Sequence, residues 1–195
     1  MEKKLKSSIN LNTRQIAVVG MLSAISIFLG ISGLGFIPIP PVKATIMHVP
    51  VIIGAIIEGP VVGGMIGLIF GIFSVINAFT NPTPLFFVFV NPIVSVVPRV
   101  VIGIASYYCY SALSTKLGTL KIALAAIVGS LINTFGVLGL MYLIYLERYA
   151  SVFNISVPAA RKGIMAVALT NGIPEAILSV LITIPVVMAV KKIKK

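Results

Sequence analysis

The chain has few charged residues, and it lacks aspartate and tryptophan altogether. Charged side chains make up 10% of the sequence, whereas a soluble domain carries roughly a quarter. The hydrophobic fraction is 58% and the mean hydropathy is +1.14. Because so few polar residues cannot cover a water-soluble surface, the lipid bilayer must be the solvent for most of the exterior.

Several motifs that carry chemistry are also missing. No Gly-x-x-x-x-Gly-Lys-Ser/Thr sequence occurs, which excludes a P-loop for ATP in this chain. The single histidine, His48, has no neighbouring cluster with metal-ligand spacing, and the single cysteine, Cys109, excludes an internal disulfide. Neither a Gly-x-Ser-x-Gly sequence nor an Asp-rich magnesium motif is found. We therefore expect transport or binding rather than an enzyme, with no catalytic residue, metal or cofactor.

Six apolar runs follow one another, separated by polar or Gly- and Pro-rich breaks. They predict an all-α membrane protein, with residues 1–195 forming one compact bundle of six transmembrane helices. The second run is short for a full span, Pro92 and Pro98 are expected to kink the fourth, and residues 147–163 are expected to form a polar connection. The approximate spans are 15–31, 44–57, 60–79, 85–113, 119–146 and 164–190.

The 15 basic residues give a net charge of +11. Nucleic-acid binding would need these cations clustered on a water-facing fold, but most lie at chain ends and in short loops. With the N-terminus inside, ten cations fall in cytoplasmic segments and four in outer loops, so the positive-inside rule favours two cytoplasmic termini. No cleavable signal peptide is apparent, and the first run is expected to be retained. The ten are Lys3, Lys4, Lys6, Arg14, Lys116, Lys121, Lys191, Lys192, Lys194 and Lys195.

Small residues line one side of two predicted helices. In the third run, glycines recur every four residues from Gly59 to Gly71, which predicts close helix packing within the bundle or, alternatively, a face for sliding or for a partner. In the first run, Gly20 and Ala24 form a small-xxx-small pair, with Ala17 on an adjacent ridge. That face can contact another helix of this chain or another protein.

Ionisable and amide side chains within the spans are costly in lipid and usually face a cavity or the protein interior. Arg99 is the strongest case, while Glu175 and Asn171 lie four residues apart on one helix face. The topology predicts that such residues converge on a pocket open to the outside; a structural Arg99–Glu175 ion pair is the alternative. The candidate binding residues from the spans are Asn91, Ser95, Arg99, Asn133, Asn171 and Glu175.

The end of the Pro-rich loop and the beginning of the second run supply further candidates. Lys43, Thr45 and His48 are expected to line the lid of the pocket, although a histidine at a helix end is commonly a packing or capping residue. The aromatic run at residues 86–89 is expected to anchor the membrane interface or, alternatively, to cover the pocket.

Three segments resemble a known family. They are the small-residue first helix at residues 14–24, the stretch 43–55 that runs into 58–64, and the pairs Asn91-Pro92 and Pro98-Arg99. Over nearly its whole length, the chain is similar to the substrate-specific S components of energy-coupling factor (ECF) vitamin transporters.

The resemblance implies the binding subunit of an ATP-driven importer for a water-soluble vitamin, in the cell membrane of a prokaryote. A transmembrane coupling protein and two ATPase subunits would be its partners, and they would hydrolyse the ATP. Ala17, Gly20 and Ala24 would face the coupling protein, with Gly20 in place of the first alanine of the family's Ala-x-x-x-Ala motif. The substrate would sit near the outer face, under the first extracellular loop.

Residues 45–50 are most similar to pantothenate-type S components. Arg99 would neutralise a carboxylate, and Asn133 and Asn171 would recognise hydroxyl and amide groups. The sequence shows no evident stacking cage for a flavin or thiamin, but riboflavin or another vitamin stays open. A small homo-oligomeric secondary transporter or channel is the alternative from another class.

Overall fold

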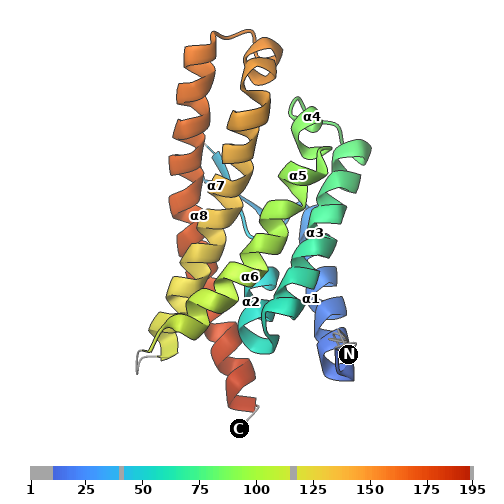
Figure 1. Cartoon of the computed structure of the whole chain (residues 1–195), viewed down its shortest axis with the longest axis vertical. Coiled ribbons are helices and arrows are strands. Elements are labelled where there is room, and N and C mark those ends of the chain that lie inside the picture. The colour runs from blue at the N-terminus through green and yellow to red at the C-terminus, as the bar shows by residue number, and fades with distance from the viewer. Residues whose placement is uncertain (1–10, 40–41, 115–117, 194–195) are drawn as a thin grey trace, which may run out of the picture.

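The computed structural model describes residues 11–39, 42–114 and 118–193 as a helical bundle (Figure 1). Within these residues, five segments are long and apolar enough to cross a membrane, which confirms a helical membrane protein. Six of the cations counted for orientation lie outside the described residues, namely Lys3, Lys4, Lys6, Lys116, Lys194 and Lys195. The five segments are α1 (Thr13–Ile31), α3 (Pro60–Thr80), the pair α5 (Pro92–Ser95) and α6 (Val97–Ala112), α7 (Gly118–Val152) and α8 (Val157–Ile193).

The predicted second span, 44–57, is wrong in its first third. Residues up to Thr45 belong to an antiparallel hairpin of β1 (Phe36–Ile39) and β2 (Val42–Thr45), and the helix α2 covers only Val49–Glu58. Ten residues give about 15 Å of helix, roughly half of the hydrocarbon core, so six full spans are not confirmed. Since α2 is apolar and almost wholly buried, it forms the centre of the bundle instead.

The predicted connection 147–163 is mostly helical. α7 continues to Val152 and α8 begins at Val157, so only four residues join them. The two arginines of this region stack on aromatic rings, Arg148 Cζ at 4.5 Å from the Phe87 ring centre and Arg161 Cζ at 5.8 Å from that of Tyr142. With 35 and 37 residues, the two helices exceed the length needed to span a membrane, and their hairpin projects past α4 in Figure 1.

The expected kinked fourth span is three separate helical pieces, α4 (Phe86–Phe89), α5 and α6. Asn91 caps α5 by accepting a hydrogen bond from the Ile93 amide at 2.9 Å. Pro92 and Pro98 each lie in the first turn of a helix rather than inside one. Because proline lacks an amide donor but fits a first turn, the two prolines begin new helices instead of bending one.

The glycine face of α3 packs within the bundle, as one of the two interpretations predicted. A Cβ placed on Gly67 would lie 2.1 Å from the carbonyl oxygen of Arg99, and one placed on Gly63 would lie 3.1 Å from the Cα of Gly103. Larger residues at these positions would push α3 and α6 apart. The glycines therefore fix how closely α3 approaches the beginning of α6.

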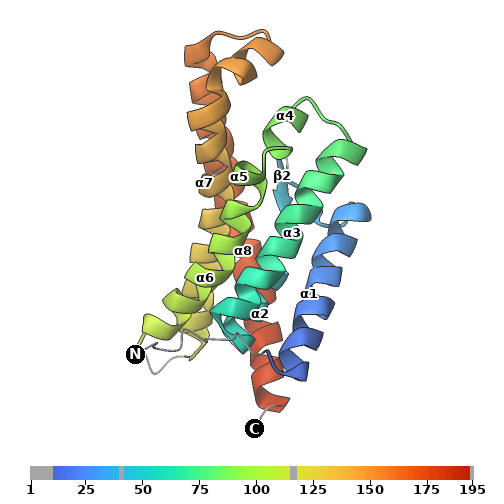
Figure 2. The same ribbon diagram turned by 45° about the vertical axis from the view of Figure 1, so that its right-hand side comes forward.

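α1 lies at the edge of the bundle in Figure 2, and it begins at the same end of the molecule at which α8 ends. Its first turn is joined to the end of α2 by an ion pair between Arg14 Nε and Glu58 Oε1 at 3.1 Å. Ala17, Gly20 and Ala24 are exposed, and the Cβ position of Gly20 has open space around it. The small-residue face of α1 thus points away from the rest of the chain.

Candidate binding site

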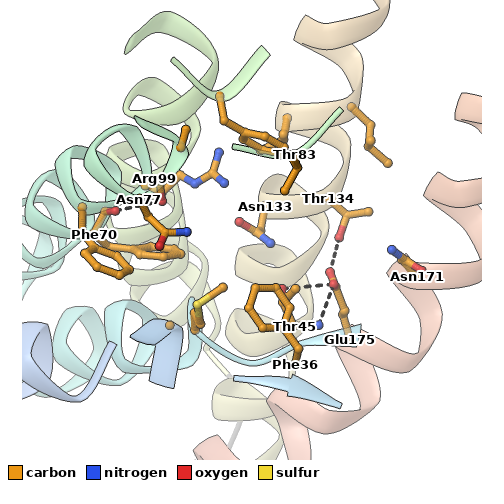
Figure 3. A pocket seen from close by; sticks show the side chains of 18 of the residues that line it. Phe36, Thr45, Phe70, Asn77, Thr83, Arg99, Asn133, Thr134, Asn171 and Glu175 are labelled. Carbon is orange, nitrogen blue, oxygen red and sulfur yellow. Dashed lines mark hydrogen bonds between the residues drawn. The ribbon is translucent and has the colours of Figure 1, made fainter. Parts of the chain in front are cut away.

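A cavity of about 330 Å³ lies between the β1–β2 hairpin and the helices α1, α3, α4, α6, α7 and α8 (Figure 3). Its volume suits a small organic molecule. Phenylalanine rings from β1, α3 and α4 provide much of the apolar wall. The polar side chains that line it are Thr45, Ser74, Asn77, Asn81, Thr83, Arg99, Asn133, Thr134, Asn171 and Glu175.

The break between α5 and α6 positions Arg99. In a continuous helix, the amide of residue 98 would donate to the carbonyl of Val94, but Pro98 has no amide hydrogen. Arg99 Nη1 takes its place and donates to Val94 O at 2.9 Å. The proline therefore leaves free the carbonyl group that fixes the guanidinium at the cavity wall.

Arg99 keeps binding capacity toward the cavity. It is 7% exposed, its Cζ lies 5.6 Å from the Phe70 ring centre, and its buried Nε has no protein partner. Among the residues that the structure describes, Arg99 and Glu175 form no ion pair. A buried cation without a protein counter-ion favours an anionic ligand.

Glu175 lies on α8 and is held by two threonines. Its Oε1 accepts hydrogen bonds from the Thr45 amide at 2.9 Å and from Thr45 Oγ1 at 3.1 Å, and its Oε2 accepts from Thr134 Oγ1 at 2.6 Å. Glu175 is 3% exposed. These bonds join β2, α7 and α8 at the cavity and leave the carboxylate in a fixed position.

Two amide side chains face the same space with free acceptors. The buried Oδ1 atoms of Asn133 and Asn171 have no hydrogen-bond partner in the described part of the chain. Buried polar atoms usually have a partner, so each can accept a hydrogen bond from a hydroxyl or amide group of a ligand.

Five of the predicted site residues line the cavity together, although they come from four elements. They are Thr45, Arg99, Asn133, Asn171 and Glu175. Lys43 lies in β2, but its side chain is outside the part that the structure describes. Asn91, Ser95 and His48 do not line the cavity, and their direct contact with a ligand stays a prediction.

Asn91 and Ser95 hold the turn that carries α4. Asn91 Nδ2 donates to Tyr145 Oη at 2.9 Å, and Ser95 Oγ donates to Phe89 O at 2.5 Å. Since Phe89 itself lines the cavity, both residues stabilise the segment that forms this part of the cavity wall without lining the cavity themselves. The covering role expected as an alternative for the aromatic run at 86–89 is consistent with the position of Phe89.

His48 lies at the beginning of α2, fully buried, and its Nε2 is 2.8 Å from Ser179 Oγ on α8. This contact joins the central helix to the helix that carries Glu175. The geometry fits the packing role that the sequence left as an alternative.

The sequence interpretation did not select the α3 part of the wall. Phe70, Ser74 and Asn77 line the cavity, and their spacing of four and three places them on one helix face. Thr134 was also passed over, although it follows Asn133 directly. Ser74 and Asn77 are polar residues late in the otherwise apolar α3, and this pattern was the signal that could have identified the α3 wall.

The fold and the cavity define a multi-pass membrane protein with a partly polar cavity of the size of a small molecule. Residues 14–187 match the family described as "ECF transporter, substrate-specific component", and the chain belongs to that family. Membership indicates a substrate-binding transport subunit. The chain is also similar to the pantothenic acid transporter PanT of Lactococcus lactis subsp. cremoris (strain MG1363), with 32% identity over 166 residues that cover 78% of this chain and 80% of the relative.

Proposed function

We propose that this protein is the high-affinity pantothenate-binding subunit of an ATP-driven ECF importer. The observation that supports the proposal is the buried guanidinium of Arg99, which has no ion pair among the described residues, in a cavity that also offers two free amide acceptors. The similarity to a pantothenic acid transporter supports the same choice of vitamin.

Pantothenate is acyclic, with a carboxylate at one end, a central amide and two hydroxyl groups. In the proposed complex, the carboxylate pairs with Arg99, because a charge-assisted hydrogen bond to a buried guanidinium is strong and selective for anions. Asn133 and Asn171 accept hydrogen bonds from the amide and hydroxyl groups of the vitamin. The phenylalanines of the wall contact its methyl groups.

The proposed assembly contains a transmembrane coupling protein and two ATPase subunits, which hydrolyse the ATP. The exposed face of Ala17, Gly20 and Ala24 would contact the coupling protein, since small residues let helices approach closely in lipid. The protein would lie in the cell membrane of a prokaryote with both termini in the cytoplasm, as the bias of the positive charges favours.

The test is equilibrium titration of the purified protein in lipid nanodiscs with pantothenate and with panthenol, in which a primary alcohol replaces the carboxylate. We expect the wild type to bind pantothenate at least about tenfold more tightly, because a hydrogen bond to a charged group contributes about 1.5–3 kcal/mol. Arg99→Ala should remove most of this preference.

Arg161→Ala is the matched control, since Arg161 stacks on Tyr142 outside the cavity. It should leave the preference for pantothenate unchanged. A folded Arg99→Ala variant with wild-type affinity for pantothenate would show that the guanidinium does not bind the carboxylate. A wild type that binds neither compound would refute the choice of vitamin.

A further inference from the structure

The cavity has two poles of opposite charge. Figure 3 shows Arg99 and Glu175 on different sides of it, with Asn133 between them in this view. Both charged side chains are buried and both line the cavity. A ligand that fills the space therefore meets a cation with one end and an anion with the other.

The hydrogen bonds around Glu175 involve both of its carboxyl oxygens. Thr45 donates its amide and its hydroxyl to one oxygen, and Thr134 donates its hydroxyl to the other at 2.6 Å. That distance is within the range for a hydroxyl that donates to an ionised carboxylate, and the Thr134 hydroxyl has a second acceptor in Ser130 O at 3.2 Å. An ionised carboxylate has about four acceptor positions, so with three in use it can accept one further hydrogen bond from the cavity.

We propose that Glu175 determines specificity by admitting pantothenate with a free terminal hydroxyl and rejecting the derivative that is phosphorylated there. The inference rests on the proposed function. With the carboxylate of the vitamin on Arg99, the hydroxyl end reaches the Glu175 pole and donates to the remaining acceptor position. A phosphate at that end brings about two negative charges to a fixed buried anion, and like charges that meet in a desolvated site strongly disfavour binding.

A reaction that phosphorylates the terminal hydroxyl would convert the substrate into a compound that this site excludes. The substrate class is therefore a mono-anion with a neutral hydrogen-bond donor at the opposite end.

The decisive variant is Glu175→Gln, which removes the charge and keeps the shape. The glutamine Oε1 can still accept from Thr45, and its Nε2 can donate to Thr134 Oγ1. The Thr134 hydroxyl then donates to Ser130 O, which lies at 3.2 Å. The variant thus keeps its local hydrogen bonds, and its folding can be checked by thermal unfolding.

The experiment measures Kd for pantothenate and for 4′-phosphopantothenate in nanodiscs. We expect the wild type to prefer pantothenate strongly, and Glu175→Gln to reduce the ratio of the two constants by at least about tenfold, chiefly by tighter binding of the phosphorylated compound. Glu147→Gln makes the same change at an exposed position outside the cavity and should leave the ratio unchanged.

The neutral 4′-O-acetyl ester of pantothenate separates charge from size without any variant. If charge decides, the wild type binds the ester much more tightly than the phosphate. Equal exclusion of both, or an unchanged ratio in folded Glu175→Gln, would overturn the inference while pantothenate binding stands. A wild type that does not bind pantothenate would refute the inference together with the proposed function.

Discussion

At the scale of single residues, polar groups at the cavity differ from those that support its wall. Arg99, Asn133 and Asn171 border the cavity, and each has a buried polar atom without a partner among the described residues. Asn91 and Ser95, in contrast, form hydrogen bonds within the protein itself. The difference matters because a buried polar group without a partner costs free energy. The free groups in the cavity are therefore the places at which we expect a ligand to bind.

The contact between His48 Nε2 and Ser179 Oγ is also made within the protein, and it gives a prediction. Ser179→Ala would leave the buried imidazole without its partner and should lower the free energy of unfolding by about 1–3 kcal/mol. Thermal unfolding in nanodiscs measures the loss, and the affinity for pantothenate should stay close to that of the wild type.

Ser151→Ala, at an exposed position near the end of α7, is the control and should leave stability unchanged. If Ser179→Ala unfolds like the wild type but binds pantothenate much more weakly, His48 acts at the binding site rather than in packing.

At the scale of elements, the close approach of α3 to α6 determines the position of the Arg99 backbone, and with it the origin of the side chain. The carbonyl of Arg99 lies against Gly67, and Gly71 lies against Val96 in the same way. Close backbone contact of this kind fixes two helices with little freedom. The position of Arg99 at the cavity therefore depends on glycines of α3 that do not line the cavity.

Gly67→Ala should separate the two helices, since the new methyl group would lie 2.1 Å from the Arg99 carbonyl oxygen. We expect a loss of about 1–3 kcal/mol in stability, as in other overpacked cores, and weaker binding of pantothenate because Arg99 moves. Thermal unfolding and titration measure the two effects.

The matched control is Gly64→Ala on the same helix, where the added Cβ would make ordinary contact, 3.8 Å from Ile104. It should be neutral or slightly stabilising, because alanine favours a helix by up to about 1 kcal/mol relative to glycine. Equal behaviour of the two variants would contradict the proposed role of the α3–α6 contact.

At the scale of the whole molecule, the cavity and the face proposed for assembly lie on different surfaces. The cavity lies between the β1–β2 hairpin and the helices of the bundle, whereas the small residues of α1 face outward at the edge of the bundle. An ion pair between Arg14 and Glu58 holds the beginning of α1 against the end of α2. A change on the outer face of α1 should therefore affect partners without affecting the ligand.

The double variant Gly20→Leu, Ala24→Leu should block assembly with the coupling protein, because bulky side chains prevent close helix approach. Co-purification with the coupling protein and the ATPase subunits measures assembly, and titration should show unchanged binding of pantothenate. Ala166→Leu, on an exposed face of α8, should leave both unchanged. A fully assembled double variant would exclude this face as the contact surface.

Much of the organisation was predictable because lipid imposes it. Long apolar runs become helices, since backbone groups in lipid must bond within their own segment. Proline-rich breaks end them, as before α2 and at Pro92. Predictions failed where local composition was a weak guide: residues 147–163 look polar, yet α7 and α8 continue through most of them, because a helix that leaves the membrane can carry charged residues.

The sequence by itself determined that the chain lies in a membrane, and it identified the ionisable side chains for which lipid offers no partner. Only the tertiary structure decided their use. It placed Thr45 and Thr134 within hydrogen-bonding distance of Glu175, and it did not bring the Glu175 carboxylate into an ion pair with Arg99. The reason is that spacing along one chain fixes which residues share a helix face, whereas the distance between two helices depends on how the whole bundle packs.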